Sequence, residues 1–218
     1  MRKSGNLLLR KMSPTLAEIE DLSTPLNVGE LKVLNFFNKH LDVKWEIYTR
    51  PPPLNGISPT FVLLHPEKGI AVFDVKNDLD NHLFTESEPY NLIQRVKLYR
   101  RKIQEICGFL GRGGTFGIFT AGLVLPQWSS DKIGEVFDVN FRATVNFRSD
   151  KYLGSKGQTI RYTNNLIIGE TNLNSGNIKH VLPNYDLSHE AMNESVLKEI
   201  RPWLNSSDSD YERAAEKL

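Results

Sequence analysis

A stretch of apolar residues at helical spacing, early in the chain, predicts an amphipathic helix over 28–41. Its apolar face begins at Glu30 and continues at +4, +7 and +11 through three large residues: Leu34, Phe37 and Leu41. Asn27 is a favourable N-cap, and Glu30 at the third helical position completes a capping-box pattern. Because Glu30 shares a face with apolar residues, we expect it to be at least partly buried.

Short apolar runs after this helix predict three strands. Residues 43–49 alternate between apolar and polar, which places three residues on one side of a strand: Val43, Trp45 and Ile47. The runs 61–65 and 70–75 are continuously apolar, as is typical of strands that are covered on both faces. The turn at 66–69 lies between them and predicts an antiparallel hairpin.

The second half of the chain predicts another long helix, further strands and a final helix. The helix over 89–110 has an apolar stripe at helical spacing: Leu92, Val96, Tyr99, Ile103, Ile106 and Leu110. Apolar runs predict strands at 116–125 and near 166–168, and a helix is expected over 188–204. This order of elements predicts an α/β fold, in which helices flank a mixed β-sheet.

The length of 218 residues suits one domain with short appendages. We expect a polar lead over 1–26 with a weak helix at 16–22, a main domain over 27–204, and a solvated tail or linker over 205–218. The apolar run at 7–9 is too short for a signal peptide, and no stretch elsewhere approaches the ~20 apolar residues of a membrane span. We therefore expect a soluble, cytoplasmic protein.

Composition narrows the class of protein further. Hydrophobic residues make up 39% of the chain and charged residues 24%, which excludes a disordered chain, a collagen and a coiled coil. The formal net charge is +1, so any basic surface that binds nucleic acid must be local. A single cysteine, Cys107, excludes an internal disulfide and a cysteine-cluster zinc site.

Asp74 is the chemically unusual residue of the second hairpin strand, because a carboxylate in an apolar strand is costly without a partner. Strand periodicity places Lys76 on the same face, and the hairpin register brings Thr60 close to Asp74. Glu30 supplies a second carboxylate from a helix that must pack on this sheet. Mg²⁺ binds carboxylate oxygens, water and phosphate, and a lysine beside it can orient the attacking water, so these residues fit a metal-dependent hydrolase. The same spacing also fits a plain Asp74–Lys76 ion pair, with Glu30 only capping its helix.

The second long helix contains a basic run, which is the candidate DNA-binding surface. Five cations occur before the first acidic residue, Glu105: Arg95, Lys97, Arg100, Arg101 and Lys102. Helical angles direct Gln94, Lys97 and Arg101 away from the apolar stripe, while the other three cations flank it. Charge alone leaves two interpretations open: contacts to phosphates, or an ordinary solvated helix face.

Several segments occur in an order that resembles a known family: NVGELKVLNFF, VKWEIYTR, SPTFVLLHPEKGIAVFDVKN and NLIQRVKLYRRKI. Over about 27–126 the chain resembles the nuclease-related domain (NERD) of the PD-(D/E)XK nuclease superfamily. The resemblance implies a restriction-endonuclease-like core, a Mg²⁺ or Mn²⁺ cofactor, and hydrolysis of phosphodiesters in DNA. Such domains often precede superfamily-1 helicase domains, and 201–218 resembles the connection into one, so a helicase domain in the same polypeptide is an implied partner.

The resemblance also assigns roles to individual residues. Glu30, Asp74 and Lys76 match the acid, acid and lysine positions of the superfamily's catalytic and metal-binding set. The carbonyl of Val75 would be a further metal ligand, and Gln94 matches a glutamine in the family's helix. The first three of these residues are also the ones that burial and periodicity single out.

Thr60 departs from the family pattern, which has an aspartate after the proline that Pro59 matches. That aspartate supplies the central metal carboxylate, whereas a threonine hydroxyl is neutral and a poor ligand for Mg²⁺. Metal binding is therefore expected to be weak or absent; Asp78 and Asp80, just downstream, are poorly suited substitutes. Two functions follow: a nuclease-like DNA-binding module whose cleavage depends on residue 60, or a catalytically inactive module that binds DNA or a protein.

Overall fold

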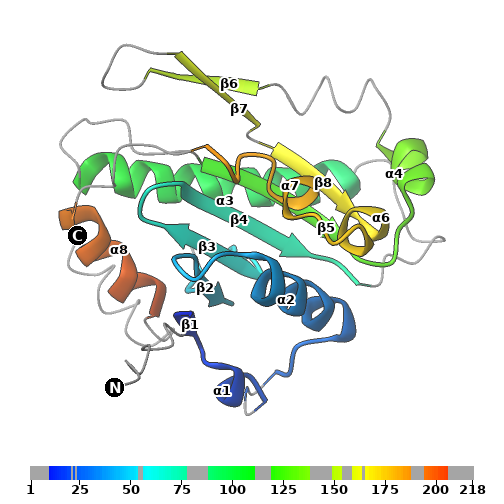
Figure 1. Cartoon of the computed structure of the whole chain (residues 1–218), viewed down its shortest axis with the longest axis horizontal. Coiled ribbons are helices and arrows are strands. Elements are labelled where there is room, and N and C mark those ends of the chain that lie inside the picture. The colour runs from blue at the N-terminus through cyan, green and yellow to red at the C-terminus, as the bar shows by residue number, and fades with distance from the viewer. Residues whose placement is uncertain are drawn as a thin grey trace, which may run out of the picture.

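A computed structural model of the chain describes residues 10–20, 22, 24–53, 56–77, 88–110, 119–137, 149–153, 159–163, 165–187 and 194–205. Six of its strands form the central sheet: β1 (Met12–Ser13), β2 (Glu46–Thr49), β3 (Phe61–His65), β4 (Gly69–Val75), β5 (Phe119–Leu125) and β8 (Asn165–Gly169). Their order across the sheet is β1-β2-β3-β4-β5-β8 (Figure 1). Two more strands pair with each other in a separate antiparallel sheet: β6 (Ser149–Leu153) and β7 (Thr159–Thr163).

The central sheet is mixed, as the sequence predicts. Strands β2, β3 and β4 are antiparallel, whereas β5 runs parallel to β4 and β8 runs parallel to β5. In the β3–β4 hairpin, Phe61 lies opposite Phe73, which is the register that a turn at 66–69 requires. Both hairpin strands are buried along their whole length, so the continuous apolar runs are explained by cover on both faces.

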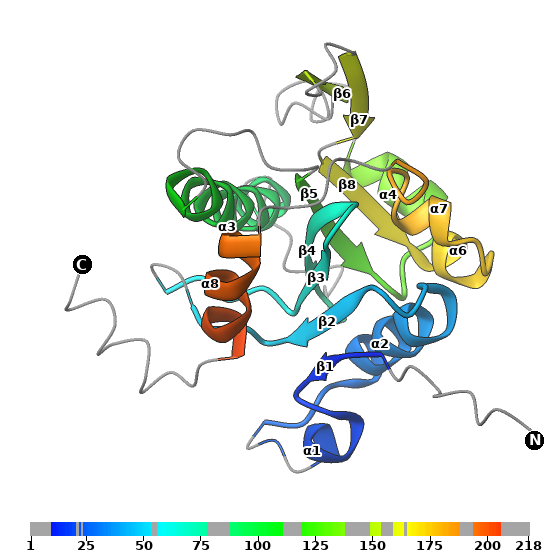
Figure 2. The same cartoon turned by 60° about the vertical axis from the view of Figure 1, so that its left-hand side comes forward.

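Helices cover the two faces of the sheet (Figure 2). One face packs against α2 (Val28–His40), α6 (Glu170–Asn174) and α7 (Ile178–Val181), and Ile19 of the short α1 (Leu16–Glu20) joins the same core. The other face packs against α3 (Glu88–Leu110), α4 (Ser130–Val136) and α8 (Glu194–Asn205). Apolar residues of β3 alternate between these cores, with Leu63 facing α2 and Val62 facing α3 and α8.

The two long helices and the capping box are confirmed. Asn27 Oδ1 accepts a hydrogen bond from the Glu30 backbone N–H at 2.9 Å, and Glu30 Oε2 accepts from the Asn27 N–H at 2.8 Å. Phe37 of α2 packs between Phe61 and Phe73, with ring centroids 5.8 and 5.3 Å away. Four stripe residues of α3 are buried: Leu92, Val96, Tyr99 and Ile103. The side chains of the other two, Ile106 and Leu110, lie outside the described residues.

The strand predicted at 43–49 begins later, at Glu46, and Val43 is 51% exposed. The cause is a turn at Asp42, whose carboxylate accepts from the Lys44 N–H and whose carbonyl accepts from the Trp45 N–H. This turn uses the backbone groups that a longer strand would have needed.

Two predicted elements extend into residues that the structure does not describe. Residues 116–118 and 188–193 are among these, and within the described ranges β5 begins at Phe119 and α8 at Glu194. The tail after 205 also lies outside them. In the described part of the chain, no helix combines the length and apolar composition that crossing a membrane requires.

Candidate functional site

A pocket of about 380 Å³ lies where β2 and β4 end and β3 begins. These ends meet because the three strands are antiparallel neighbours, and the first turn of α2 adds a side chain from beside the sheet. The polar side chains and backbone that line it include Glu30, Arg50, Thr60, Asp74, Val75 and Lys76. The structure therefore brings together the predicted acids, the lysine, the carbonyl-bearing valine and the threonine.

Asp74 is 5% exposed and has two partners in the pocket. The Thr60 hydroxyl donates to Asp74 Oδ1 at 3.2 Å, and Lys76 Nζ lies 3.5 Å from Asp74 Oδ2. The Thr60 oxygen also accepts a hydrogen bond from the Val75 backbone N–H at 2.9 Å. The predicted proximity of Thr60 and Asp74 is confirmed, and so is the shared face of Asp74 and Lys76.

Glu30 is 7% exposed and also combines two roles. Its Oε2 atom accepts from the Asn27 N–H in the capping box and lies 3.1 Å from Arg50 Nη2 in an ion pair. The expected burial of Glu30 is confirmed. The capping role and the position beside the pocket are both present, so neither interpretation of Glu30 excludes the other.

Arg50 is the pocket residue that sequence reasoning missed. Its guanidinium donates to the carbonyl oxygens of Thr24 and Pro25, and its backbone N–H donates to the Thr60 carbonyl at 2.8 Å. Its φ of +50° lies in the left-handed region, which few non-glycine residues adopt. Strained backbone of this kind is found most often at functional sites. The only sequence signal is its place at the end of a strand and before three prolines, and that position does not reveal the conformation.

Among the described residues, the two pocket carboxylates are engaged with cations of the chain and are not arranged as a site for a resident divalent cation. Within the described ranges, no group of three or more His, Cys, Asp or Glu side chains is placed to hold a metal ion. Glu30 and Asp74 each have a cationic partner at ion-pair distance, and Thr60 contributes no charge. The downstream acids Asp78 and Asp80 lie outside the described residues.

Gln94 does not line this pocket. It is half-buried on α3. The role that the family resemblance implies for Gln94 therefore remains a prediction.

Three cations of the basic run on α3 lie close enough to repel one another: Lys97, Arg100 and Arg101. Arg95 and Arg101 are exposed, whereas three cations are half-buried: Lys97, Arg100 and Lys102. The pKa of Lys97 lies below its usual range, chiefly because burial disfavours the ammonium and further because Arg100 and Arg101 repel it. Lys97 is thus less exposed than the helical angle predicts, and it lies close to the like charges of Arg100 and Arg101.

A hydrogen bond connects this helix to the wall of the pocket. The Tyr99 hydroxyl, buried under α3, donates to the Pro52 carbonyl at 2.9 Å. Pro51 and Pro53, on either side, both line the pocket. The helix that carries the basic cluster is therefore fixed to the same loop that encloses Asp74.

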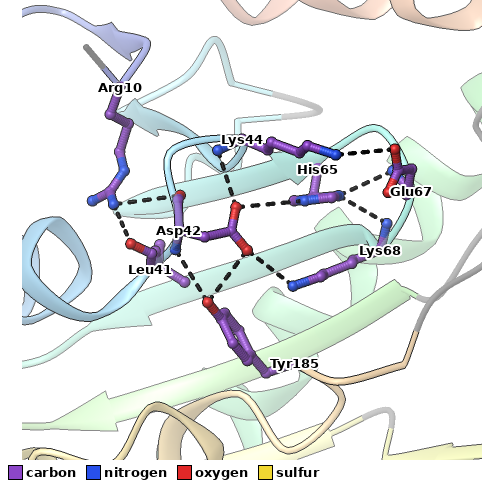
Figure 3. A network of polar contacts seen from close by, with 8 residues as sticks. All are labelled: Arg10, Leu41, Asp42, Lys44, His65, Glu67, Lys68 and Tyr185. Atoms are coloured by element: carbon purple, nitrogen blue, oxygen red, sulfur yellow. Dashed lines mark hydrogen bonds and ion pairs between the residues drawn. The ribbon is translucent and has the colours of Figure 1, made fainter. Parts of the chain in front are cut away.

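A second polar network surrounds the β3–β4 turn, beside a hollow of about 280 Å³ (Figure 3). His65 is 1% exposed, and its Nδ1 accepts from the backbone N–H groups of Glu67 and Lys68 at 3.0 and 3.1 Å. Its Nε2 faces Asp42, 3.7 Å away, and Asp42 in turn binds Lys68 and the hydroxyl of Tyr185. Both ring nitrogens of His65 are thus directed at groups of the chain, and the network stabilises the turn.

Comparisons with known proteins do not assign the chain to a family: no family model, no curated protein and no solved structure matches it. Membership of the nuclease-related domain family and a PD-(D/E)XK core therefore remain predictions from resemblance. The structure establishes a coarser description, an α/β fold in which helices flank a six-stranded mixed sheet.

Proposed function

We propose that this chain is a nuclease-like DNA-binding module that holds the substrate but, with threonine at position 60, does not cut it. One observation supports this proposal most strongly. Glu30 from α2 and Asp74, Val75 and Lys76 from the end of β4 line one pocket, with Thr60 at the position where the family pattern has aspartate. Glu30 and Asp74 come from separate elements, and the fold brings both to one pocket, as the proposal requires.

The chemistry of residue 60 accounts for the proposed lack of cleavage. A neutral hydroxyl adds no charge to attract Mg²⁺ or Mn²⁺, and here it is engaged with Asp74 and the Val75 N–H. A cation that bound would have to compete with Lys76 for Asp74 and with Arg50 for Glu30.

The basic cluster on α3 supplies the proposed affinity for DNA. Arg95 and Arg101 are exposed, and Arg100 and Arg101 lie close enough to Lys97 to lower its pKa, so several positive charges face a phosphate bound at this helix. The hydrogen bond from Tyr99 to Pro52 fixes this helix against the pocket loop. A strand of DNA that follows the helix is thus held near the pocket by contacts to its backbone, which carry no sequence preference.

A second candidate is a protein-interaction module, attached to a helicase domain in the same polypeptide. The observation that favours it is charge compensation: Lys102 pairs with Glu105 at 2.8 Å, and both pocket carboxylates have cationic partners. A basic run whose members are partly paired within the chain is closer to a solvated helix face.

Fluorescence anisotropy with labelled single-stranded and double-stranded oligonucleotides, in the presence of Mg²⁺, tests the proposal directly. We expect binding that weakens as salt is raised, and intact DNA when the same samples are run on a denaturing gel. Absence of binding to both oligonucleotides at low salt would contradict the DNA-binding function and favour the protein-interaction module.

A further inference from the structure

We infer that Arg50 and Lys76 are built-in counter-ions of the pocket, which hold its two carboxylates in place of a divalent cation. The inference rests on the proposed function for the identity of the pocket, and it adds a residue, Arg50, that no motif in the sequence indicates.

The two carboxylates are buried deeply enough to need compensation. Glu30 is 7% exposed and Asp74 is 5% exposed, and a buried carboxylate without a cationic partner is strongly destabilising. Arg50 Nη2 lies 3.1 Å from Glu30 Oε2, and Lys76 Nζ lies 3.5 Å from Asp74 Oδ2. Each carboxylate therefore has its own cation, supplied by the chain.

The two negative charges of Glu30 and Asp74 are balanced by the two positive charges of Arg50 and Lys76. Thr60, which also lines the pocket, adds no charge. An aspartate at position 60 would leave the pocket with one uncompensated negative charge, which is the condition that attracts a divalent ion. Threonine at this position and the Glu30–Arg50 ion pair are thus consistent with each other, and both favour a pocket free of metal.

Arg50 is held in place more firmly than an incidental surface ion pair. Its guanidinium also donates to the carbonyl oxygens of Thr24 and Pro25, so it bridges the segment before α2 to the pocket. Its backbone N–H is bonded to the Thr60 carbonyl, and the chain adopts a left-handed φ at this residue. Fixed donors of this kind lose little entropy on binding a carboxylate, and a metal ion would have to displace them.

Removal of the Arg50 charge should therefore create affinity for a divalent cation. Arg50→Asn is a suitable variant, because asparagine tolerates a left-handed backbone and carries no charge. Mn²⁺ is the probe, measured by electron paramagnetic resonance of the free ion and by calorimetric titration. We expect Mn²⁺ to bind at least about tenfold more tightly than it binds the parent chain, since one positive charge near a divalent ion has been removed.

Two further variants localise the effect. The gain should disappear in Arg50→Asn/Glu30→Gln, since glutamine preserves the capping box but removes the uncovered carboxylate. Lys198→Gln, on the exposed face of α8, makes the same change in net charge away from the pocket and should leave Mn²⁺ binding unchanged. Circular dichroism and thermal unfolding confirm that each variant is folded.

The second counter-ion gives an independent test that leaves the Thr24–Pro25 segment intact. Lys76→Gln, whose side chain is 31% exposed in the parent, should also raise Mn²⁺ affinity, and Asp74→Asn should cancel that gain. Unchanged Mn²⁺ affinity in folded Arg50→Asn and in Lys76→Gln would overturn the inference, as would a gain that survives Glu30→Gln. DNA binding is measured separately, so a failure of the proposed function and a failure of this inference give different results.

Discussion

Thr60 faces Asp74 across the start of the β3–β4 hairpin, and its hydroxyl both donates to the Asp74 carboxylate and accepts from the Val75 N–H. One small side chain thus satisfies a buried charge and a buried backbone donor. An aspartate could accept from the same N–H but could not donate to Asp74 without being protonated. The identity of residue 60 therefore decides whether this end of the hairpin is a closed hydrogen-bonded unit or a group of acids.

Thr60→Val is the direct test of that unit. Valine has nearly the same shape but leaves the Asp74 Oδ1 atom and the Val75 N–H without these partners, so we expect a loss of about 1–3 kcal/mol in the free energy of unfolding. Urea titration followed by tryptophan fluorescence measures it. Thr60→Ser keeps the hydroxyl and should lose clearly less; equal losses for valine and serine would show that the methyl group matters and the hydrogen bonds do not.

The hairpin that produces this arrangement could be predicted from the sequence because its turn fixes its register. A turn at 66–69 permits one pairing of the flanking apolar runs, and that pairing brings Thr60 to Asp74. The burial of Glu30 was equally accessible, since a capping residue at the start of an apolar stripe has little freedom.

Arg50 could not be predicted because its role depends on tertiary contacts. Its left-handed backbone and its bonds to Thr24 and Pro25 exist only once the segment before α2 lies beside the end of β2. The short elements β1, α6 and α7 were missed for a related reason. Helices and strands of two to five residues have no periodicity of their own, and packing against the sheet stabilises them.

The basic cluster gives a prediction about salt dependence. If Lys97 and Arg101 bind phosphates, Lys97→Ala/Arg101→Ala should weaken DNA binding irrespective of sequence and reduce the slope of log affinity against log salt by about one for each phosphate that is no longer bound. Anisotropy over a salt series measures the slope. Lys39→Ala/Lys179→Ala is the matched control, because these exposed lysines lie on α2 and α7, on the opposite side of the sheet. If both double variants have the same salt slope, the basic run does not bind phosphates and is an ordinary solvated helix face.

The last helix of the described residues, α8, is joined to the sheet by an ion pair between Arg201 and Glu46. Glu46 is buried, and it accepts two bonds from Arg201 to Oε1, at 2.7 and 3.0 Å, besides bonds from Tyr48 and Lys11. Arg201→Ala should lower the free energy of unfolding by about 3 kcal/mol, the lower end of the cost of breaking a buried pair, because Tyr48 and Lys11 remain.

Chemical denaturation measures this loss, and Lys198→Ala on the exposed face of the same helix should change the stability little. A loss below about 1 kcal/mol for Arg201→Ala would show that the pair contributes no more than an ordinary surface ion pair. Helix α8 would then be stabilised by its apolar face alone.

The turn network of Figure 3 predicts a loss of stability in mild acid. The pKa of His65 is lowered, chiefly because burial disfavours the imidazolium; attraction to Asp42 opposes this shift, and repulsion from Lys68 offsets part of that attraction. The folded state therefore prefers neutral His65, so its stabilising contribution is complete above the unfolded pKa of about 6.5 and is lost as the pH falls through the lower folded value. A proton on Nδ1 would also oppose the two N–H groups that donate to it.

Urea unfolding between pH 7.5 and pH 4.5 measures this dependence, whose slope for one group approaches about 1.4 kcal/mol per pH unit. His65→Asn keeps a side-chain acceptor near the turn but cannot titrate, so it should flatten the slope in this range. Asp42 has a lowered pKa and contributes only at still lower pH. An unchanged slope in the asparagine variant would assign the acid sensitivity to another group.

The most direct measurement of the proposed function is Mn²⁺-dependent cleavage of DNA by the Thr60→Asp variant, compared on one gel with the parent chain and with Thr60→Asp/Lys76→Ala. We expect the parent to leave single-stranded, double-stranded and nicked DNA intact, the aspartate variant to cut, and the loss of Lys76 to reduce cutting by about 10²–10⁴-fold. An inert Thr60→Asp chain on all three substrates, or a parent chain that already cuts and is indifferent to Lys76→Ala, would contradict the assignment of this pocket.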